Sequence, residues 1–269
     1  MSTIKLFLNE HISSFKQLIS LSISSTRKHY AGTSLGIFWS LYKDIIYLVT
    51  YSFFMTFIYR GGSIDGAPRT VYLVTGMLAW FFISEVLSTG SQCLIRNRSI
   101  FKSIKFPVSI IPTYETLSIF YRRSLTYVIG FIILAFFGYL KNIQPLLFIY
   151  YNFAMIMLMI AFTHFISGFI AISKDFKELY MAIIRIIIYF IPIFWSVESI
   201  GGLTDLAIVK KLILANPITY ILCGFRESFQ VSNYITINYH LYFWGVVFLL
   251  LILGAVLQGR LRKFYPDFL

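Results

Sequence analysis

The chain has 269 residues, of which 58% are hydrophobic and only 13% are charged. Soluble domains carry about 25% charged residues and at most about half apolar ones, so this composition excludes an ordinary soluble fold and favours one membrane domain. The net charge of +12 would suggest a nucleic-acid partner in a soluble protein. Here we expect none, because the positions of the basic residues indicate membrane topology instead.

Residues 1–34 are expected to form an amphipathic helix region on the cytoplasmic surface of the membrane. A soluble, core-facing helix is the alternative, but the chain offers little soluble core to face. No cleaved signal peptide is indicated, since no compact apolar run is followed by a small-residue cleavage site. The apolar side comprises Ile12, Phe15, Leu18, Ile19 and Ile23, and the polar side comprises Ser13, Lys16, Gln17, Ser20 and Arg27.

Residues 35–269 are predicted to form a single all-α transmembrane domain with six spans. The spans are expected at about 35–59, 71–95, 124–140, within 142–173, 179–197 and 240–258. The apolar stretch 212–225 is too short to cross and is interrupted by Asn216-Pro217. It therefore predicts a pair of re-entrant half-helices within about residues 205–230.

The basic residues set the predicted orientation. Six crossings place both termini on one side, and sixteen of the 23 Lys and Arg residues then fall on that side. Six fall on the other side, and Arg185 lies within the fifth span. The excess indicates that both termini are cytoplasmic.

Catalytic motifs are absent from the sequence. It contains no G-x-x-x-x-G-K-[ST] phosphate loop, no H-E-x-x-H, no C-x-x-C and no G-x-S-x-G. We therefore expect a transport or scaffolding protein that is not an enzyme, with no cofactor in this chain.

Three arginines near or within the spans are the sharpest candidate site residues. Guanidinium groups bind phosphate oxygens in a bidentate manner, and charges at membrane depth are usually functional. We expect one or more of Arg122, Arg123 and Arg185 to receive a phosphorylated headgroup or the phosphates of a polymer. Two alternatives stay open: the adjacent pair snorkels to lipid headgroups, or Arg185 forms a structural pair with Glu85 or Glu115.

Tyrosines in the spans are candidates for lining a substrate path, because their rings can stack on other rings and offer a polar edge. Lipid-facing or interfacial positions are the alternative for most of them. The candidates are Tyr114, Tyr121 and Tyr189, with Tyr42, Tyr47 and Tyr51.

Several segments resemble one family in their order and spacing. They are Tyr30-Ala-Gly-Thr-Ser-Leu-Gly-Ile-Phe-Trp39, Phe106-Pro-Val-Ser-Ile-Ile-Pro112, Arg185-Ile-Ile-Ile-Tyr-Phe-Ile-Pro-Ile-Phe-Trp195, Asn216-Pro217 and Phe225-Arg226. Together they resemble permease subunits of ABC-2 type polysaccharide exporters. The second segment and the terminal Asp267-Phe-Leu269 are most similar to wall teichoic acid permeases. One departure is Lys43-Asp44, which occupies a region where the family usually carries a proline.

The resemblance implies a homodimer in the bacterial plasma membrane that works with two copies of a separate ATPase chain, which binds ATP and magnesium. The cargo would be a polymer on a polyprenyl diphosphate lipid, and residues 1–34 would be the interface helix. A coupling loop at about 96–112 would dock on the ATPase through Arg96, Arg98, Ile100, Phe101, Lys102 and Lys105. An outer re-entrant gate would contain Asn216, Pro217, Phe225 and Arg226.

Other functions remain as alternatives. A related permease could carry capsular or O-antigen-type polysaccharide, or a small molecule. A membrane enzyme should show convergent acidic or His residues, and these are sparse in the sequence. A secondary carrier should show repeated halves with matching broken helices, whereas one interrupted segment is present.

Overall fold

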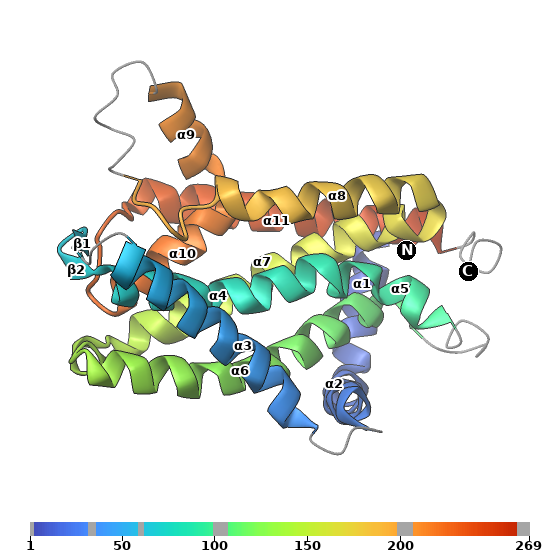
Figure 1. Ribbon diagram of the computed structural model, residues 1–269. Coiled ribbons are helices and arrows are strands. Elements are labelled where there is room, and N and C mark those ends of the chain that lie inside the picture. Colours follow the sequence, from blue (N-terminus) through green and yellow to red (C-terminus); the bar gives the residue numbers. More distant parts are fainter. Residues whose placement is uncertain (1–2, 32–35, 59–61, 99–106, 198–206, 263–269) are drawn as a thin grey trace.

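The computed structural model describes residues 3–31, 36–58, 62–98, 107–197 and 207–262 (Figure 1). These residues are almost entirely helical, in agreement with the predicted all-α membrane fold. A two-stranded antiparallel hairpin of β1 (Ser63–Ile64) and β2 (Ala67–Pro68) is the exception within them. Its turn uses Asp65 and Gly66 at positive φ, the conformation that a tight hairpin turn requires.

The N-terminal region forms two helices, α1 (Thr3–Ser13) and α2 (Phe15–Tyr30). Leu18 and Ser22 of α2 are buried against the rest of the protein, while Ile12, Phe15 and Ile23 are exposed. Leu18, which was predicted on the apolar side, is thus packed inside the protein, while the exposed apolar side chains are compatible with a helix on a membrane surface. That location stays a prediction.

The expected first span is α3 (Ile37–Phe53), which continues as a π-helix η1 (Phe54–Ile58). The second comprises α4 (Arg69–Ser88), a 3₁₀ turn η2 (Gly90–Gln92) and the short helix α5 (Cys93–Arg96). Both agree closely with the predicted ranges, because apolar runs of this length form helices in lipid.

The third predicted span, which corresponds to α6, differs from the prediction. After the 3₁₀ turn η4 (Val108–Ile110), α6 (Ile111–Phe136) begins 13 residues before the expected start at residue 124. Pro112 lies in its first turn, where its missing N–H costs nothing. The sequence pattern missed this part because polar residues interrupt the stretch 111–123. Most of these residues are buried, and α6 packs against α2 and α4.

Five more α-helices follow in the described part of the chain. The 3₁₀ turn η5 (Leu140–Asn142) leads into α7 (Pro145–Ile172), which is followed by α8 (Lys174–Phe190), α9 (Ala207–Ala215), α10 (Pro217–Ser228) and α11 (Ile237–Leu261). The fifth predicted span ran to Val197, but α8 ends at Phe190. Ile191 precedes Pro192 and is extended, because a proline disfavours helix at the residue before it.

Four stretches are long and apolar enough to cross a membrane. They are Arg69–Arg96, Val108–Phe136, Pro145–Ile172 and Ile237–Leu261. Helices α3 and α8 have 17 residues each, although η1 lengthens the first. The chain is a multi-pass membrane protein, and six crossings remain a prediction.

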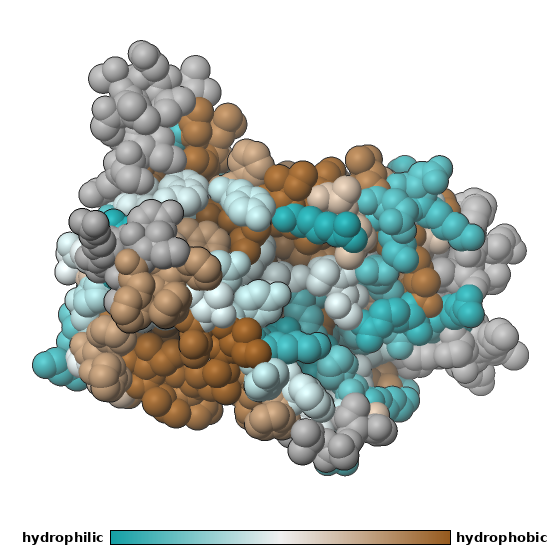
Figure 2. Space-filling view, viewed as in Figure 1, coloured by the Kyte–Doolittle hydropathy of each residue, from teal (hydrophilic) through white to brown (hydrophobic). Residues whose placement is uncertain are grey.

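Helices α1 and α5 and the end of α11 share one end of the bundle, which we call the terminal end (Figure 1). An ion pair there joins Arg262 to Glu10 at 2.5 Å, and the Ser109 hydroxyl donates to the same carboxylate. The hairpin, α9 and α10 lie at the opposite end, which we call the hairpin end. Figure 2 shows many hydrophilic residues toward the terminal end, and a hydrophobic patch over α3 and α6 at the lower left of the view.

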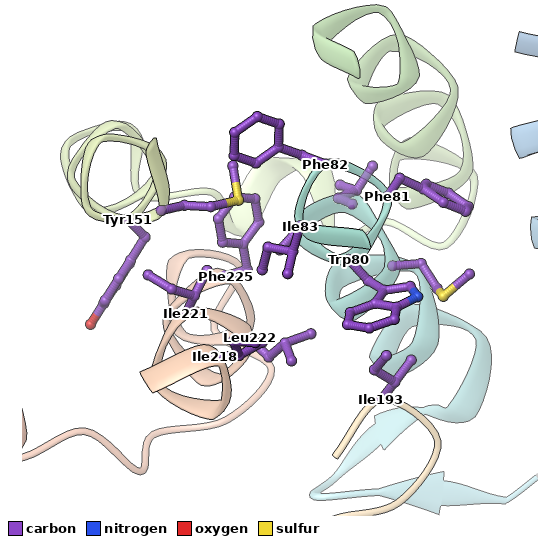
Figure 3. Packing of buried hydrophobic residues seen from close by; sticks show 14 of the residues in the cluster. Trp80, Phe81, Phe82, Ile83, Tyr151, Ile193, Ile218, Ile221, Leu222 and Phe225 are labelled. Atoms are coloured by element: carbon purple, nitrogen blue, oxygen red, sulfur yellow. The ribbon is translucent and has the colours of Figure 1, made fainter. Parts of the chain in front are cut away.

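The main core lies between α4, α7 and α10. In Figure 3, Ile83 of α4 points toward Phe225 of α10, Trp80 lies beside Ile193, and Tyr151 of α7 lies on the other side of α10. Gly224 permits this approach, since a Cβ there would lie 2.2 Å from the Tyr151 ring. The core therefore fixes α4 firmly. Helix α3 adds Leu48 to the core, but α3 and α8 also carry many exposed apolar side chains.

Candidate functional site

A network of two arginines and two carboxylates joins α3, α4 and α6. Nη2 of Arg122 donates to Oε1 of Glu85 at 2.7 Å. Nη1 of Arg123 donates to Oδ1 of Asp44 at 2.6 Å, and its Nε donates to Glu85. The Thr126 hydroxyl donates to the second oxygen of Asp44. The four charges neutralise one another across three helices.

This network is largely closed to solvent. The side chains of Arg122 and Asp44 are 2% and 3% exposed, and that of Arg123 is 21% exposed. Charges at membrane depth are tolerated when they pair with one another. The sequence placed both arginines at the start of a span, but α6 begins eleven residues before Arg122, at Ile111. Their partners are carboxylates of neighbouring helices, so the snorkelling alternative does not describe them.

A cavity of about 800 Å³ lies beside the network, bounded by α2, α3, α4, α6 and α8. Its volume falls within the range of about 300–1,000 Å³ that small-ligand sites occupy. Three aromatic residues, three cations and a carboxylate meet there. The lining residues are Tyr30, Trp39, Trp80, Lys43, Arg123, Arg185, Glu85, His29, Gly36, Ser84, Ser88, Thr89, Ile184 and Ile188.

Two of these cations, Lys43 and Arg185, form no ion pair within the part of the chain that the structure describes. The sequence left open a pairing of Arg185 with Glu85 or Glu115. Glu85 is instead bound by the two α6 arginines, and Glu115 pairs with Arg96 at 3.0 Å. Arg185 therefore keeps its charge available to the cavity.

His29 of α2 adds a polar ring to the cavity wall. Burial lowers the pKa of His29 below its ordinary value, and the positive charge of nearby Arg122 lowers it further. The lowered pKa favours the neutral imidazole, which leaves the positive charge of the cavity to the lysine and arginines.

The predicted tyrosines do not line this cavity. Tyr114 is buried in a small cluster with Leu18 and Cys93 at the terminal end. Tyr121 and Tyr189 are exposed on the surface of α6 and α8. The aromatic lining is provided by the tryptophans of α3 and α4 and by Tyr30.

Further rings extend along α3 from the cavity toward the hairpin end. The centroids of Trp39 and Tyr42 lie 5.8 Å apart, and Tyr47 stacks on Tyr51 at 6.2 Å. Tyr51 in turn contacts Phe194 at 4.8 Å. An exposed aromatic face of this kind can stack on sugar rings or on lipid.

The predicted coupling residues are only partly described. Arg96 ends α5 and is bound to Glu115, and Arg98 is exposed beyond it. Ile100, Phe101, Lys102 and Lys105 lie outside the described residues.

The expected break at Asn216-Pro217 is present between α9 and α10. The Asn216 side chain caps α10 by accepting from the N–H of Ile218 at 2.9 Å, and Pro217 lies in the first turn. Phe225 and Arg226, which were predicted to form a gate, are fully buried. Their burial anchors α10 in the core, and a gating role for them stays a prediction.

No family model matches the chain. It is 22% identical over 264 residues to the O-antigen export system permease protein RfbA of Klebsiella pneumoniae, covering 95% of both chains. The chain thus resembles an export permease along nearly its whole length. A second RfbA from the same organism is 23% identical over 262 residues, again with 95% of each chain covered. One from Myxococcus xanthus is 18% identical over 213 residues, or 79% of each.

These similarities support, at low identity, the ABC-2 polysaccharide exporter permease family whose motifs the sequence resembles. They also support a permease subunit rather than an enzyme.

Sequence reasoning missed several residues of the site. Asp44 and Lys43 were noted only as a departure from a family proline, and neither tryptophan was singled out. A usable signal existed, because α3, α4, α6 and α8 each carry charges within an apolar helix. Charged side chains within membrane helices usually pair with one another, so a cluster among these four helices could have been predicted.

Proposed function

We propose that this chain is the permease subunit of an ATP-driven exporter that carries a polyprenyl-diphosphate-linked polymer across the bacterial plasma membrane. The similarity to O-antigen export permeases over 95% of the chain is the observation that carries this proposal. A multi-pass helical fold and a charged, aromatic cavity among its helices support it.

The motor is a separate ATPase chain. No phosphate loop occurs in this sequence, so ATP and magnesium would be bound by the partner, in two copies. Two copies of the permease around a two-fold axis would enclose a wider path than one chain can. The exposed apolar faces of α3 and α8 support such pairing. The ATPase would dock at the terminal end, near residues 96–112, with both chain termini in the cytoplasm.

Two cargo polymers are supported by different observations. The segments Phe106-Pro-Val-Ser-Ile-Ile-Pro112 and Asp267-Phe-Leu269 are similar to wall teichoic acid permeases. The curated relatives are named as O-antigen export permeases. Both polymers would present the same lipid diphosphate to the permease, so the cavity is compatible with either cargo.

Depletion of this chain in its host tests the proposal. Surface polymer should fall while diphosphate-linked polymer accumulates inside, and an ATPase chain should co-purify with the tagged permease. The composition of the accumulated polymer identifies the cargo: polyol phosphate indicates teichoic acid, and repeating sugars indicate an O-antigen-type glycan. Unchanged surface polymers together with no co-purifying ATPase would contradict the proposal.

A further inference from the structure

We propose that Lys43 and Arg185 together form a diphosphate-binding site in the cavity, and that Arg122 and Arg123 take no direct part in it. This inference rests on the proposed export function. It assigns ligand binding to two of the cations and a structural role to the paired arginines. It identifies one residue, Lys43, that was not among the sequence candidates.

The charge balance of the cavity supports this division. Arg122 and Arg123 are matched by Glu85 and Asp44 at ion-pair distances, so their network has no net charge. Within the described residues, Lys43 and Arg185 have no carboxylate within ion-pair distance. Two positive charges therefore face the cavity without compensation. A diphosphate diester carries one negative charge on each phosphate, which matches them.

The positions of the two cations strengthen the argument. Lys43 is the seventh residue of α3, and Arg185 is the twelfth of the 17 residues of α8. Each stands well inside an apolar helix, where an unpaired cation is costly unless it serves a ligand or pathway. Arg185 is flanked on the cavity wall by Ile184 and Ile188. Both cations are exposed to an incoming ligand rather than packed into the core.

The paired arginines give the site a fixed wall. Asp44 follows Lys43 in the chain and is held by Arg123 and Thr126 of α6. This contact fixes the turn of α3 from which Lys43 projects. A phosphate that sought Arg123 would have to displace two carboxylates, whereas the guanidinium of Arg185 is free to donate in a bidentate manner.

The rest of the cavity suits a sugar next to the diphosphate. Trp80, Ser84 and Ser88 are spaced four residues apart and line one face of α4, and Trp39 stands on α3. Indole rings stack on sugar rings, and the hydroxyl oxygens can accept hydrogen bonds. The site would thus recognise the junction between the lipid diphosphate and the first sugar.

Equilibrium binding to the full chain tests this site. The chain is placed in nanodiscs of phosphatidylcholine and titrated with polyprenyl-diphosphate-N-acetylglucosamine or with the matched polyprenyl-monophosphate sugar. With Trp195 and Trp244 replaced by Phe, the emission of Trp39 and Trp80 reports binding in the cavity. We expect the diphosphate ligand to bind at least tenfold more tightly than the monophosphate. Lys43→Gln and Arg185→Gln should each weaken diphosphate binding at least tenfold.

The matched control is Lys174→Gln, which removes an exposed charge at the start of α8 outside the cavity and should leave binding unchanged. Unchanged binding in both Lys43→Gln and Arg185→Gln would overturn the site. Equal affinity for the two ligands, or equal competition by phosphatidylglycerol, would also overturn it, since a general lipid-headgroup site would then suffice. These outcomes are separate from the depletion experiment: a failed titration with a normal export phenotype rejects the site and leaves the proposed function standing.

Discussion

The guanidinium carbon of Arg226 lies 3.6 Å from the centroid of the Tyr72 ring, and this contact joins α10 to α4 at the hairpin end. Arg226 is fully buried, and its Nη2 donates to the carbonyl of Ile193 at 3.2 Å. Gly76 leaves room for the group, since a Cβ there would lie 2.8 Å from Nη2. One arginine therefore holds three segments of the chain together.

We expect Tyr72→Leu to destabilise the protein by about 2 kcal/mol or more, because a desolvated cation–π contact is worth about that much. Thermal unfolding in detergent measures the effect. Tyr72→Phe is the matched control. It keeps the ring and removes only the hydroxyl that donates to the carbonyl of Trp195, a loss of about 1 kcal/mol. Equal losses in the two variants would show that the ring contact contributes nothing.

Arg123→Gln should lower the free energy of unfolding by about 3–5 kcal/mol, because it leaves Asp44 buried without its ion-pair partner. Lys43→Gln, at the neighbouring residue, should lower the free energy of unfolding by less than about 0.5 kcal/mol. The Lys43 side chain is exposed and forms no buried ion pair with any residue that the structure describes, and substitutions of such side chains rarely have a larger effect. The double variant Arg123→Gln, Asp44→Asn should lose less stability than the sum of the two single variants. The difference, which is the coupling energy of the pair, should be about 1–3 kcal/mol. Strict additivity in this cycle would contradict a structural role for the pair.

Much of the helical fold could be predicted from hydrophobic runs. Helices α7 and α11 lie close to their predicted ranges because few charges interrupt them. The early part of α6 was missed because its polar residues are satisfied by distant partners: Glu115 by Arg96 and Ser25, and Arg122 by Glu85. Such pairings depend on tertiary packing, which periodicity does not encode.

The candidate site was only partly predictable for the same reason. Arg185 was identified because a lone charge within an apolar helix is conspicuous. Trp39 and Trp80 could not be distinguished in a chain with 28 Phe and 19 Tyr. Tyr114 was a reasonable candidate by residue type, but packing places it in a separate cluster.

The docking of α1 should weaken at acidic pH through His11. Its Nε2 bonds to the hydroxyl of Thr113 at 3.0 Å, and its Nδ1 lies 2.9 Å from the carbonyl of Phe7. Burial is the main influence and lowers the pKa of His11 from its ordinary value of 6.5, although the Phe7 carbonyl and Glu10 oppose the shift.

The unfolded or undocked segment therefore binds a proton before the docked one does. The contribution of His11 to stability is complete above pH 6.5 and declines as the pH falls below that value. Hydrogen exchange of the α1 amides, corrected for intrinsic rates, should be faster at acidic than at neutral pH. His11→Gln should flatten this dependence, and protection that stays equal at both pH values in the native chain would contradict the prediction.

Gly254 should be intolerant of any side chain, because α7 and α11 pack backbone to backbone there. An added Cβ would lie 2.9 Å from the Cβ of His164 and from the backbone nitrogen of Phe165. Small residues permit such close approach between membrane helices. We expect Gly254→Ala to lower the free energy of unfolding by about 1–3 kcal/mol, which is the usual effect of overpacking.

The same helix supplies its own control. Gly245 also lies in α11, but an added Cβ there meets no atom within 4 Å among the described residues. Gly245→Ala should be neutral or stabilising by up to about 1 kcal/mol, since alanine favours helix over glycine. Thermal unfolding of the two variants side by side separates packing from helix propensity. If Gly254→Ala raises the midpoint as Gly245→Ala does, helix propensity dominates, and the close approach of α7 and α11 at Gly254 does not limit stability.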